Sequence, residues 1–355
     1  MELELERIEC AGSPRELGLA QGEALAERIQ GFVAQRLDAA AIYLSERGAH
    51  SVADLLDVGK ACLAVSKNYH PDGYAEHLGI AEAAKIDPAV LYATTNMTDV
   101  RDILLLGKRA DAEGCSVALI PKGLAQDHRL IAAQTWDLNP TDLEYVVAIH
   151  RTPKVGPRTW SVTCAGALSL VGMNEHGLTV GTTNLKTHGS RVGVGYLSIL
   201  HRALSSRSRV EASQLVREAP RAGGHTYFLA DANGAQEFEC SATLCVERTL
   251  ESEPLVRTNH CVSAEVKSLE GEAPSNSSLK RLARLGSVLA RGEHSVATVR
   301  ALFSDRTDGA DSVNRYAEDK QGTSTNACFI GIPEALTFSV CRGSADRGRW
   351  VTLSF

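Results

Sequence analysis

Apolar residues in the first third of the chain recur at the spacing of an α-helix. Ser13, Pro14 and Glu16 combine an N-cap, a first-turn proline and a capping acid. The apolar positions that follow at roughly helical spacing are Leu17, Ala20, Ala24, Ile29, Phe32 and Val33. Further helices are expected over about residues 51–67, 71–84 and 88–97, with almost no strand signal after residue 10. The pattern predicts a helical N-terminal region.

The character of the chain changes at Cys115, where short apolar runs bounded by turn residues begin. Strands are expected at about 115–120, 130–136, 145–150, 160–163, 165–171, 178–184, 226–230, 235–240, 327–332, 336–341 and 350–355. Two helical blocks, about 195–218 and 277–303, interrupt them. This order is typical of the α+β class and fits two antiparallel sheets covered by helices.

Composition and charge narrow the possible functions. The net charge of -6 and the pI near 6.0 argue against a dedicated nucleic-acid partner. The N-terminus alternates acidic and apolar residues and does not resemble a signal peptide. The longest uncharged apolar stretch, Cys164 to Met173, is about half of what a membrane helix needs. We therefore expect a soluble, cytoplasmic protein without a membrane partner.

The nine cysteines are scattered and odd in number, so a disulfide framework is not expected. Cys240 and Cys245, with His260-Cys261 further on, raise the possibility of a zinc site. Their spacing fits no common structural zinc site, and Cys240 ends a strand-like run. We predict neither a metal nor a cofactor.

Gly114-Cys115 stands where a charged loop becomes an apolar strand, and taken alone this cysteine could be an ordinary strand residue. Five further motifs change that interpretation because they occur in a particular order. They are Leu19-Ala-Gln-Gly22, Gln134-Thr-Trp-Asp137, Asn174-Glu-His-Gly-Leu-Thr-Val-Gly-Thr-Thr-Asn184, Arg257-Thr-Asn-His260 and Ser278-Leu-Lys-Arg281.

With Glu113-Gly114-Cys115-Ser116, these motifs resemble the acyl-coenzyme A:6-aminopenicillanic acid acyltransferase family. That family lies within the choloylglycine-hydrolase group of N-terminal-nucleophile enzymes. The resemblance spans nearly the whole chain and implies an αββα sandwich of two antiparallel sheets. It also implies self-cleavage between Gly114 and Cys115. A helical chain of residues 1–114 would then stay bound to a catalytic chain of residues 115–355, as an α/β heterodimer that could assemble further into a homo-oligomer.

The same resemblance implies the roles of the site residues. Cys115 would be the nucleophile, and the Asn259 side chain with the Asn184 backbone N–H would stabilise the oxyanion. Asp137 would position the new amino group, and Arg281 would orient Asp137 and influence the sulfur. The partner would be a small-molecule amide or acyl donor.

These residue types suit the chemistry. Once the bond before Cys115 breaks, the new α-amino group has a reference pKa of about 7.7–8.0, so much of it can act as a base near neutral pH. Nucleophile and base then come from one residue, and no histidine is required. The expected reaction cleaves an amide through a thioester.

Some positions depart from the family pattern. Bile-salt and penicillin V hydrolases carry arginine where Gln134 stands, so those activities are not expected. Thr135 replaces a common asparagine. A family stretch of the type Ser-Ile-Cys-Arg-His is here Ser312-Val-Asn-Arg-Tyr316, which puts the pocket around it in doubt.

Three alternatives stay open at this point. An acyltransferase would pass the acyl group from the same thioester to another amine. The chain contains the cysteine and histidine residues that a papain-like protease would need, although Cys115 lacks the surroundings typical of that class. The third alternative is an uncleaved, non-enzymatic binding protein that keeps the fold.

Overall fold

The computed structural model describes residues 3–47, 50–105 and 114–355. Within these ranges the N-terminal region is mainly helical. Its helices are α1 (Pro14–Ala24), α2 (Ala26–Arg47), α3 (Val52–Tyr69), α4 (Pro71–Ala83), α5 (Pro88–Thr95) and α6 (Met97–Leu105). The predicted start of α1 is confirmed, because Ser13 accepts from the backbone of Glu16 while the Glu16 side chain reaches back to Ser13. The apolar positions between Leu17 and Val33, which were predicted to follow one helical spacing, lie on two helices that meet at Leu25.

The strands of the described residues form two sheets. One has the order β1 (Glu6–Gly12), β4 (Val146–Pro153), β5 (Thr159–Cys164), β6 (Val171–Asn174), β7 (Thr179–Leu185), β8 (Gly224–Asp231), β9 (Gly234–Cys240) and β10 (Cys245–Thr249). The other has the order β11 (Leu255–Arg257), β2 (Gly114–Ile120), β3 (Ile131–Leu138), β12 (Ser324–Ile332), β13 (Thr337–Arg342) and β14 (Val351–Leu353).

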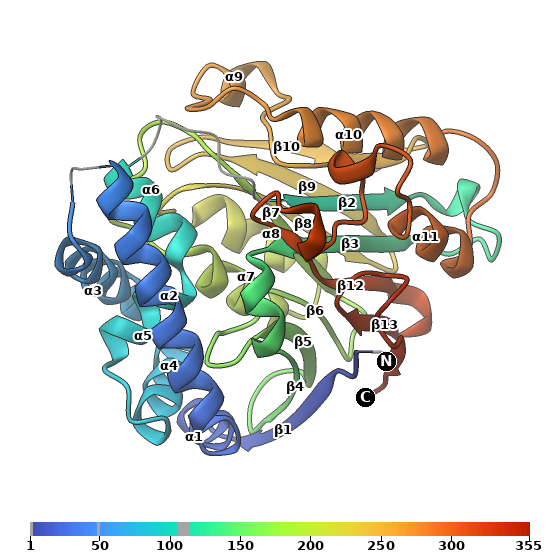
Figure 1. Ribbon diagram of the computed structural model, residues 1–355. Coiled ribbons are helices and arrows are strands. Elements are labelled where there is room, and N and C mark those ends of the chain that lie inside the picture. The colour runs from blue at the N-terminus through green and yellow to red at the C-terminus, as the bar shows by residue number, and fades with distance from the viewer. Residues whose placement is uncertain (1–2, 48–49, 106–113) are drawn as a thin grey trace.

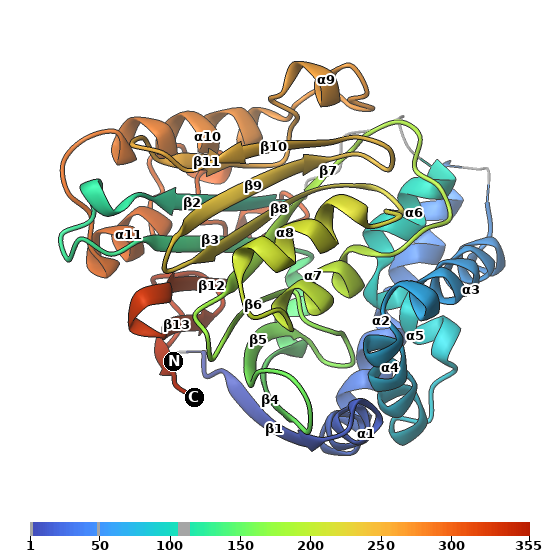
Figure 2. The same cartoon turned by 180° about the vertical axis from the view of Figure 1, so that it is seen from behind.

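The two sheets face each other, and helices cover their outer faces (Figures 1 and 2). The outer helices are α7 (Tyr196–Leu204) and α8 (Arg209–Glu218) on one sheet, and α10 (Asn276–Leu289) and α11 (Val296–Phe303) on the other. Between the sheets, Phe228 of β8 and Phe329 of β12 stack with ring centroids 6.0 Å apart. The predicted αββα fold class is therefore confirmed.

Alternation along β2 shows how the chain fills this sandwich. Cys115, Val117 and Leu119 belong to the apolar core between the sheets, whereas Ala118 and Ile120 pack under α10 and α11. Every residue of β2 is buried because both faces of the strand are covered. This explains why the strand reads as a continuous apolar run.

The N-terminal region is built into the same body. Strand β1 adds to the edge of the larger sheet by pairing in parallel with β4 over Glu6 to Gly12. The two expected antiparallel sheets are present, and the β1–β4 pair is a parallel addition at the edge of the larger one. Figures 1 and 2 show α1–α6 gathered beside the sandwich, where the apolar residues of α1, α2, α4 and α5 join the central core.

Several element predictions need correction. The strand expected at 165–171 begins only at Val171, because residues 165–170 form a buried turn in which Gly166 has a positive φ of 85°. Each of the two helical blocks is divided into two helices. The short edge strands β10 and β11 and helix α9 (Ala264–Lys267) were not predicted, since such short, polar elements leave no periodic signal.

Candidate active site

Cys115 is the second residue of β2 and is 8% exposed. In the ladder with β3 it lies opposite Trp136, and both side chains belong to the core between the sheets. The thiol of Cys115 therefore occupies the inner face of the sandwich at the end of β2 where that strand begins.

The Asn259 side chain contacts the backbone of this cysteine. The backbone N–H of Cys115 donates to Asn259 Oδ1 at 2.7 Å, and Asn259 Nδ2 donates to the carbonyl oxygen of Asn184 at 3.3 Å. Asn259 lies just after β11, and its own backbone N–H donates to Ser278 Oγ at 2.9 Å. One amide side chain thus connects the start of β2 with the C-terminal end of β7.

Arg281 of α10 contacts the Cys115 backbone and the Asn259 side chain from the outer side of the sheet. Its guanidinium donates to the carbonyl oxygen of Cys115, to Ser116 Oγ at 3.1 Å and to Asn259 Oδ1 at 3.0 Å. A further bond, Nε to Ser277 Oγ at 3.1 Å, attaches it to its own helix. Burial lowers the pKa of Arg281 to about 10, so the side chain keeps its positive charge near neutral pH.

Asp137 lies on the other side of the Gly114–Cys115 peptide. It pairs with Gly114 in the β2–β3 ladder and is 1% exposed. Burial raises the pKa of Asp137, and the positive charges of Arg281 and Arg315 oppose that rise. A Cβ on Gly114 would lie only 2.7 Å from both Asp137 Oδ2 and Arg315 Nη1, so a side chain at this position would have to displace these two charged groups.

The structure therefore brings all the predicted site residues together: Gly114, Cys115, Asp137, Asn184, Asn259 and Arg281. The preceding residue of the predicted processing motif, Glu113, lies outside the described residues.

Two neighbours were missed as site residues. Ser278 orients the turn by accepting from the Asn259 backbone and by contacting His260 Nδ1 at 2.8 Å. Arg315 lies beside Gly114 and Asp137. Arg315 could have been identified from the sequence. It is the arginine of Ser312-Val-Asn-Arg-Tyr316 and keeps the position of the arginine in the corresponding family stretch.

Buried charges hold the turn that carries Asn259. Arg257 is 1% exposed and pairs with Glu237 and Glu239 of β9. Burial disfavours the guanidinium cation, but these two carboxylates outweigh burial and raise the pKa of Arg257. Glu239 also accepts from the backbone N–H groups of Val262 at 2.8 Å and Ser263 at 3.0 Å. The turn is therefore held at both ends.

Gln134 joins the two sheets directly. Its Nε2 donates to the carbonyl of Thr182 at 2.8 Å, and its Oε1 accepts from the backbone N–H of Thr182 at 3.0 Å. A Cβ on Gly181 would lie 2.5 Å from Gln134 Oε1, so a glycine permits this approach. Gln134 is fully buried and pairs with the backbone of β7, one residue before Thr183 and two before Asn184.

The sulfur atoms of Cys240 and Cys245 lie 3.2 Å apart across β9 and β10. In the described part of the chain, no group of three or more His, Cys, Asp or Glu side chains is arranged to hold a metal ion. Among the described helices, none is both long and apolar enough to cross a membrane.

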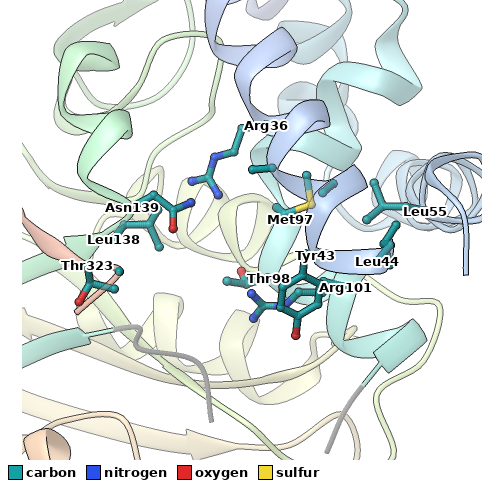
Figure 3. Close-up of a pocket in the computed structure, with 13 residues that line it drawn as sticks. Arg36, Tyr43, Leu44, Leu55, Met97, Thr98, Arg101, Leu138, Asn139 and Thr323 are labelled. Atoms are coloured by element: carbon teal, nitrogen blue, oxygen red, sulfur yellow. The ribbon is translucent and has the colours of Figure 1, made fainter. Parts of the chain in front are cut away.

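A cavity of about 240 Å³ opens beside the site, between the N-terminal helices and the ends of β3 and β12 (Figure 3). Helices α2, α3 and α6 form one wall. Leu138 and Asn139 lie on the opposite side, together with Gly322 and Thr323. Leu138 directly follows Asp137, which places the cavity next to the start of β2.

The family model described as acyl-coenzyme A:6-aminopenicillanic acid acyl-transferase matches residues 124–347. No curated protein matches the sequence significantly.

Among solved structures, two variants of the conjugated bile acid hydrolase from Clostridium perfringens are similar at 10% identity. Each match covers 68% of this chain and 97% of that chain, with TM-scores of 0.40 and 0.37. Penicillin V acylase from Agrobacterium tumefaciens is similar at 12% identity, covering 67% of this chain and 86% of that chain, with a TM-score of 0.34. Because the family model spans well over half of the sequence, this chain belongs to the acyl-coenzyme A:6-aminopenicillanic acid acyl-transferase family.

Proposed function

We propose that this protein is a self-processing cysteine amidohydrolase that cleaves small-molecule amides through a thioester on Cys115. The observation that carries the proposal is the bonding around that residue. Its backbone N–H donates to Asn259, and its carbonyl accepts from the buried, charged Arg281. Buried backbone groups of a strand usually find these partners in a neighbouring strand, whereas here both partners are polar side chains from other parts of the chain.

In the processing step, Cys115 Sγ attacks the carbonyl carbon of Gly114. The peptide C–N bond breaks, its nitrogen takes a proton to become the amino group of Cys115, and a thioester forms. Water then hydrolyses the thioester, which leaves a carboxylate on Gly114 and a free thiol. The absence of a side chain on Gly114 leaves room beside this residue for the Asp137 carboxylate and the Arg315 guanidinium.

In the mature enzyme, the new amino group takes the proton of the thiol and later delivers it to the leaving amine. Asn259 Oδ1 already accepts from this nitrogen in the uncleaved chain and can keep doing so afterwards. Asn259 Nδ2 and the backbone N–H of Asn184 are then the proposed donors to the oxyanion of the tetrahedral intermediate.

The two chains produced by cleavage are expected to remain together. Glu76 of α4 and residues of the second chain share a buried cluster, in which Arg151 Nε lies 2.7 Å and His201 Nε2 lies 3.2 Å from its carboxylate. Burial alone would raise the pKa of Glu76, but Arg151 and His201 lower it to about 2. With the β1–β4 ladder, this cluster supports an α/β heterodimer.

An acyltransferase is the second candidate, because the name of the family describes acyl transfer. It would use the same thioester and the same residues, and would differ only in the acceptor. Adding a primary amine during turnover distinguishes the two functions. A transferase converts most of the acyl group into the new amide, whereas a hydrolase releases mainly the free acid.

We expect the purified protein to consist of two chains, residues 1–114 and 115–355, that elute together. Intact mass spectrometry tests this, because the two masses must add up to that of the full chain plus one water. Terminal sequencing should find Cys115 with a free amine. A protein that keeps one full-length chain after prolonged incubation would contradict self-processing and favour the non-enzymatic alternative.

We expect kcat/KM of the mature enzyme to rise with pH through a transition around pH 6–8, as the Cys115 amino group loses its proton. The charge on Arg281 disfavours the ammonium form, so Arg281→Leu should move the midpoint upward. The carboxylate of Asp137 favours the ammonium form, so Asp137→Asn should move the midpoint downward. Profiles between pH 5 and 9 provide the measurement. Unchanged midpoints in both variants would show that neither side chain acts on the amine.

A further inference from the structure

Two cysteine side chains outside the candidate active site are positioned to bond to each other. Cys240 ends β9, Cys245 begins β10, and the two residues lie directly opposite each other in the antiparallel ladder. Both are free thiols, and the Cys240 thiol donates to Cys245 Sγ at 3.2 Å. A disulfide bond of about 2.05 Å therefore requires the two sulfur atoms to approach by only about 1 Å.

The backbone of this hairpin suits such a bond. The backbone N–H of Ser241 donates to the carbonyl oxygen of Leu244 at 3.0 Å, which closes the turn. Hydrogen-bonded and non-hydrogen-bonded pairs alternate along an antiparallel ladder, so the next pair, Cys240 and Cys245, is of the non-hydrogen-bonded kind. Its Cα atoms are then about 4.5 Å apart, within the range that disulfides span. Both side chains pack in the apolar cluster beneath α7 and α8.

The two thiols differ in access and in acidity. Cys240 is fully buried, whereas Cys245 is half-buried beside Leu244, which is 38% exposed. The hydrogen bond from Cys240 lowers the pKa of Cys245 against the effect of burial, and the charges of Arg221 and Arg217 add to this. Burial raises the pKa of Cys240. Cys245 is thus the thiol that a reagent can reach and that ionises more readily, as attack on a disulfide requires.

Arg221 holds the turn between the two cysteines. Its Nε donates to the carbonyl oxygen of Ser241 at 3.0 Å, and its Nη2 donates to that of Leu244 at 3.4 Å. Nη1 donates to the carbonyl oxygen of Val216 in α8 at 2.7 Å. The turn is therefore attached to the helix that covers the sheet, and the sulfur atoms are held close together before any bond forms.

We propose that Cys240 and Cys245 form a reversible disulfide by exchange with a low-molecular-weight disulfide such as glutathione disulfide. The Cys245 thiolate attacks one sulfur of the reagent, whose S–S bond breaks to give a mixed disulfide and one glutathione thiolate. Cys240 Sγ then loses its proton, attacks Cys245 Sγ and releases the second glutathione. Two protein thiols are oxidised, one disulfide is reduced to two thiols, and the protons of the cysteines are balanced by those on the two glutathiones. This exchange does not involve Cys115 and is separate from the proposed amidohydrolase function.

The bond links the edge strand of the larger sheet to residues that support the candidate site. Strand β10 is the last in the sheet order, and Glu239, which holds the turn that carries Asn259, directly precedes Cys240. Cys240 also lies opposite His225 of β8, which lies opposite Asn184 of β7. We expect the disulfide to raise Tm by a few degrees, a small effect because the loop that it closes is short.

The test incubates the purified protein with an excess of glutathione disulfide over glutathione, alkylates the remaining thiols in denaturant and digests the protein with trypsin. Peptide 222–248 contains Cys240 and Cys245 and no other cysteine. Most of this peptide should become lighter by two hydrogens and lose its alkylation, and dithiothreitol should restore both. Tm of the wild type should rise by a few degrees on oxidation, and Cys245→Ser should not show this rise.

A matched control pair lies in the same chain. Cys328 and Cys341 are opposite each other on β12 and β13, and they are 1% and 0% exposed. Both belong to peptide 321–342, so the same digest reports on them. Because a reagent in solution can reach neither thiol, this peptide should stay reduced. Cys240→Ser should retain glutathione on Cys245, since no second thiol is present to release it.

Each other outcome overturns a particular claim. Full alkylation of peptide 222–248 after oxidation overturns the disulfide itself. Equal oxidation of peptide 321–342 overturns the claim that access to Cys245 selects the pair. Cys240→Ser without bound glutathione overturns Cys245 as the attacking thiol, and an equal rise of Tm in Cys245→Ser overturns the effect on stability. These measurements use no amide turnover, so the proposed amidohydrolase function stands or fails separately.

Discussion

Cys115→Ala is expected to leave a single uncleaved chain and no measurable amide turnover. The alanine has no nucleophile for the attack on the Gly114 carbonyl, and without cleavage no free α-amine is formed to act as a base. Both functions are lost because both depend on one residue. The fold should persist, since replacing a small buried thiol with a methyl group removes little volume.

Cys115→Ser separates the two steps. Its hydroxyl can carry out the N→O acyl shift but is a weaker nucleophile, so we expect slow cleavage and poor turnover. Intact mass over several days and hydrolysis rates of the same samples provide the measurement. Cys245→Ala and Cys261→Ala are the matched controls and should be processed and active. Normal activity of Cys115→Ala, or loss of activity in the two control variants, would refute the assignment of the nucleophile.

Asn259→Ala is expected to lower kcat of the mature enzyme by about 10²–10³, the usual effect of removing one oxyanion donor. The amide also accepts from Cys115 N and Arg281 Nη2, so the variant removes a group that connects the nucleophile residue with the arginine. KM should change less, because the proposed donor acts on charge that develops in the transition state.

This measurement requires mature protein, since the same donor can assist self-cleavage. If the variant is processed slowly, a specific protease site placed directly before Cys115 supplies the mature chain. Asn233→Ala removes an exposed amide in the β8–β9 turn and controls for the substitution itself. A near-normal kcat in mature Asn259→Ala would show that the oxyanion is stabilised by other groups.

Local patterns predicted most of the elements because their causes lie within a few residues of each other. The capping box at Ser13 and Glu16 is one such pattern, and the turn between β8 and β9 is another. Residues 165–170 failed as a strand prediction because their apolar character reflects burial in a turn, where one positive φ at Gly166 ends the strand. Burial alone does not distinguish an apolar strand from an apolar turn.

The motifs also located the candidate site. The residues around Cys115, Asp137, Asn184, Asn259 and Arg281 come from separate parts of the chain, and the structure places them side by side. Their catalytic roles stay predictions, to be decided by the variants above. Motif order could indicate that these residues belong together, but it carried no information on which atoms meet.

By itself, the sequence determined the helical and strand character of each region, the αββα class through its resemblance, and the candidate nucleophile. Only the tertiary structure decided that β1 pairs in parallel with β4, that Gln134 bonds to the other sheet, and that Arg315 lies beside Gly114. It also decided the cavity, whose walls come from segments far apart in the chain. The physical reason is that periodicity and capping depend on neighbours in sequence, whereas sheet order, buried hydrogen bonds and cavities depend on how whole elements pack.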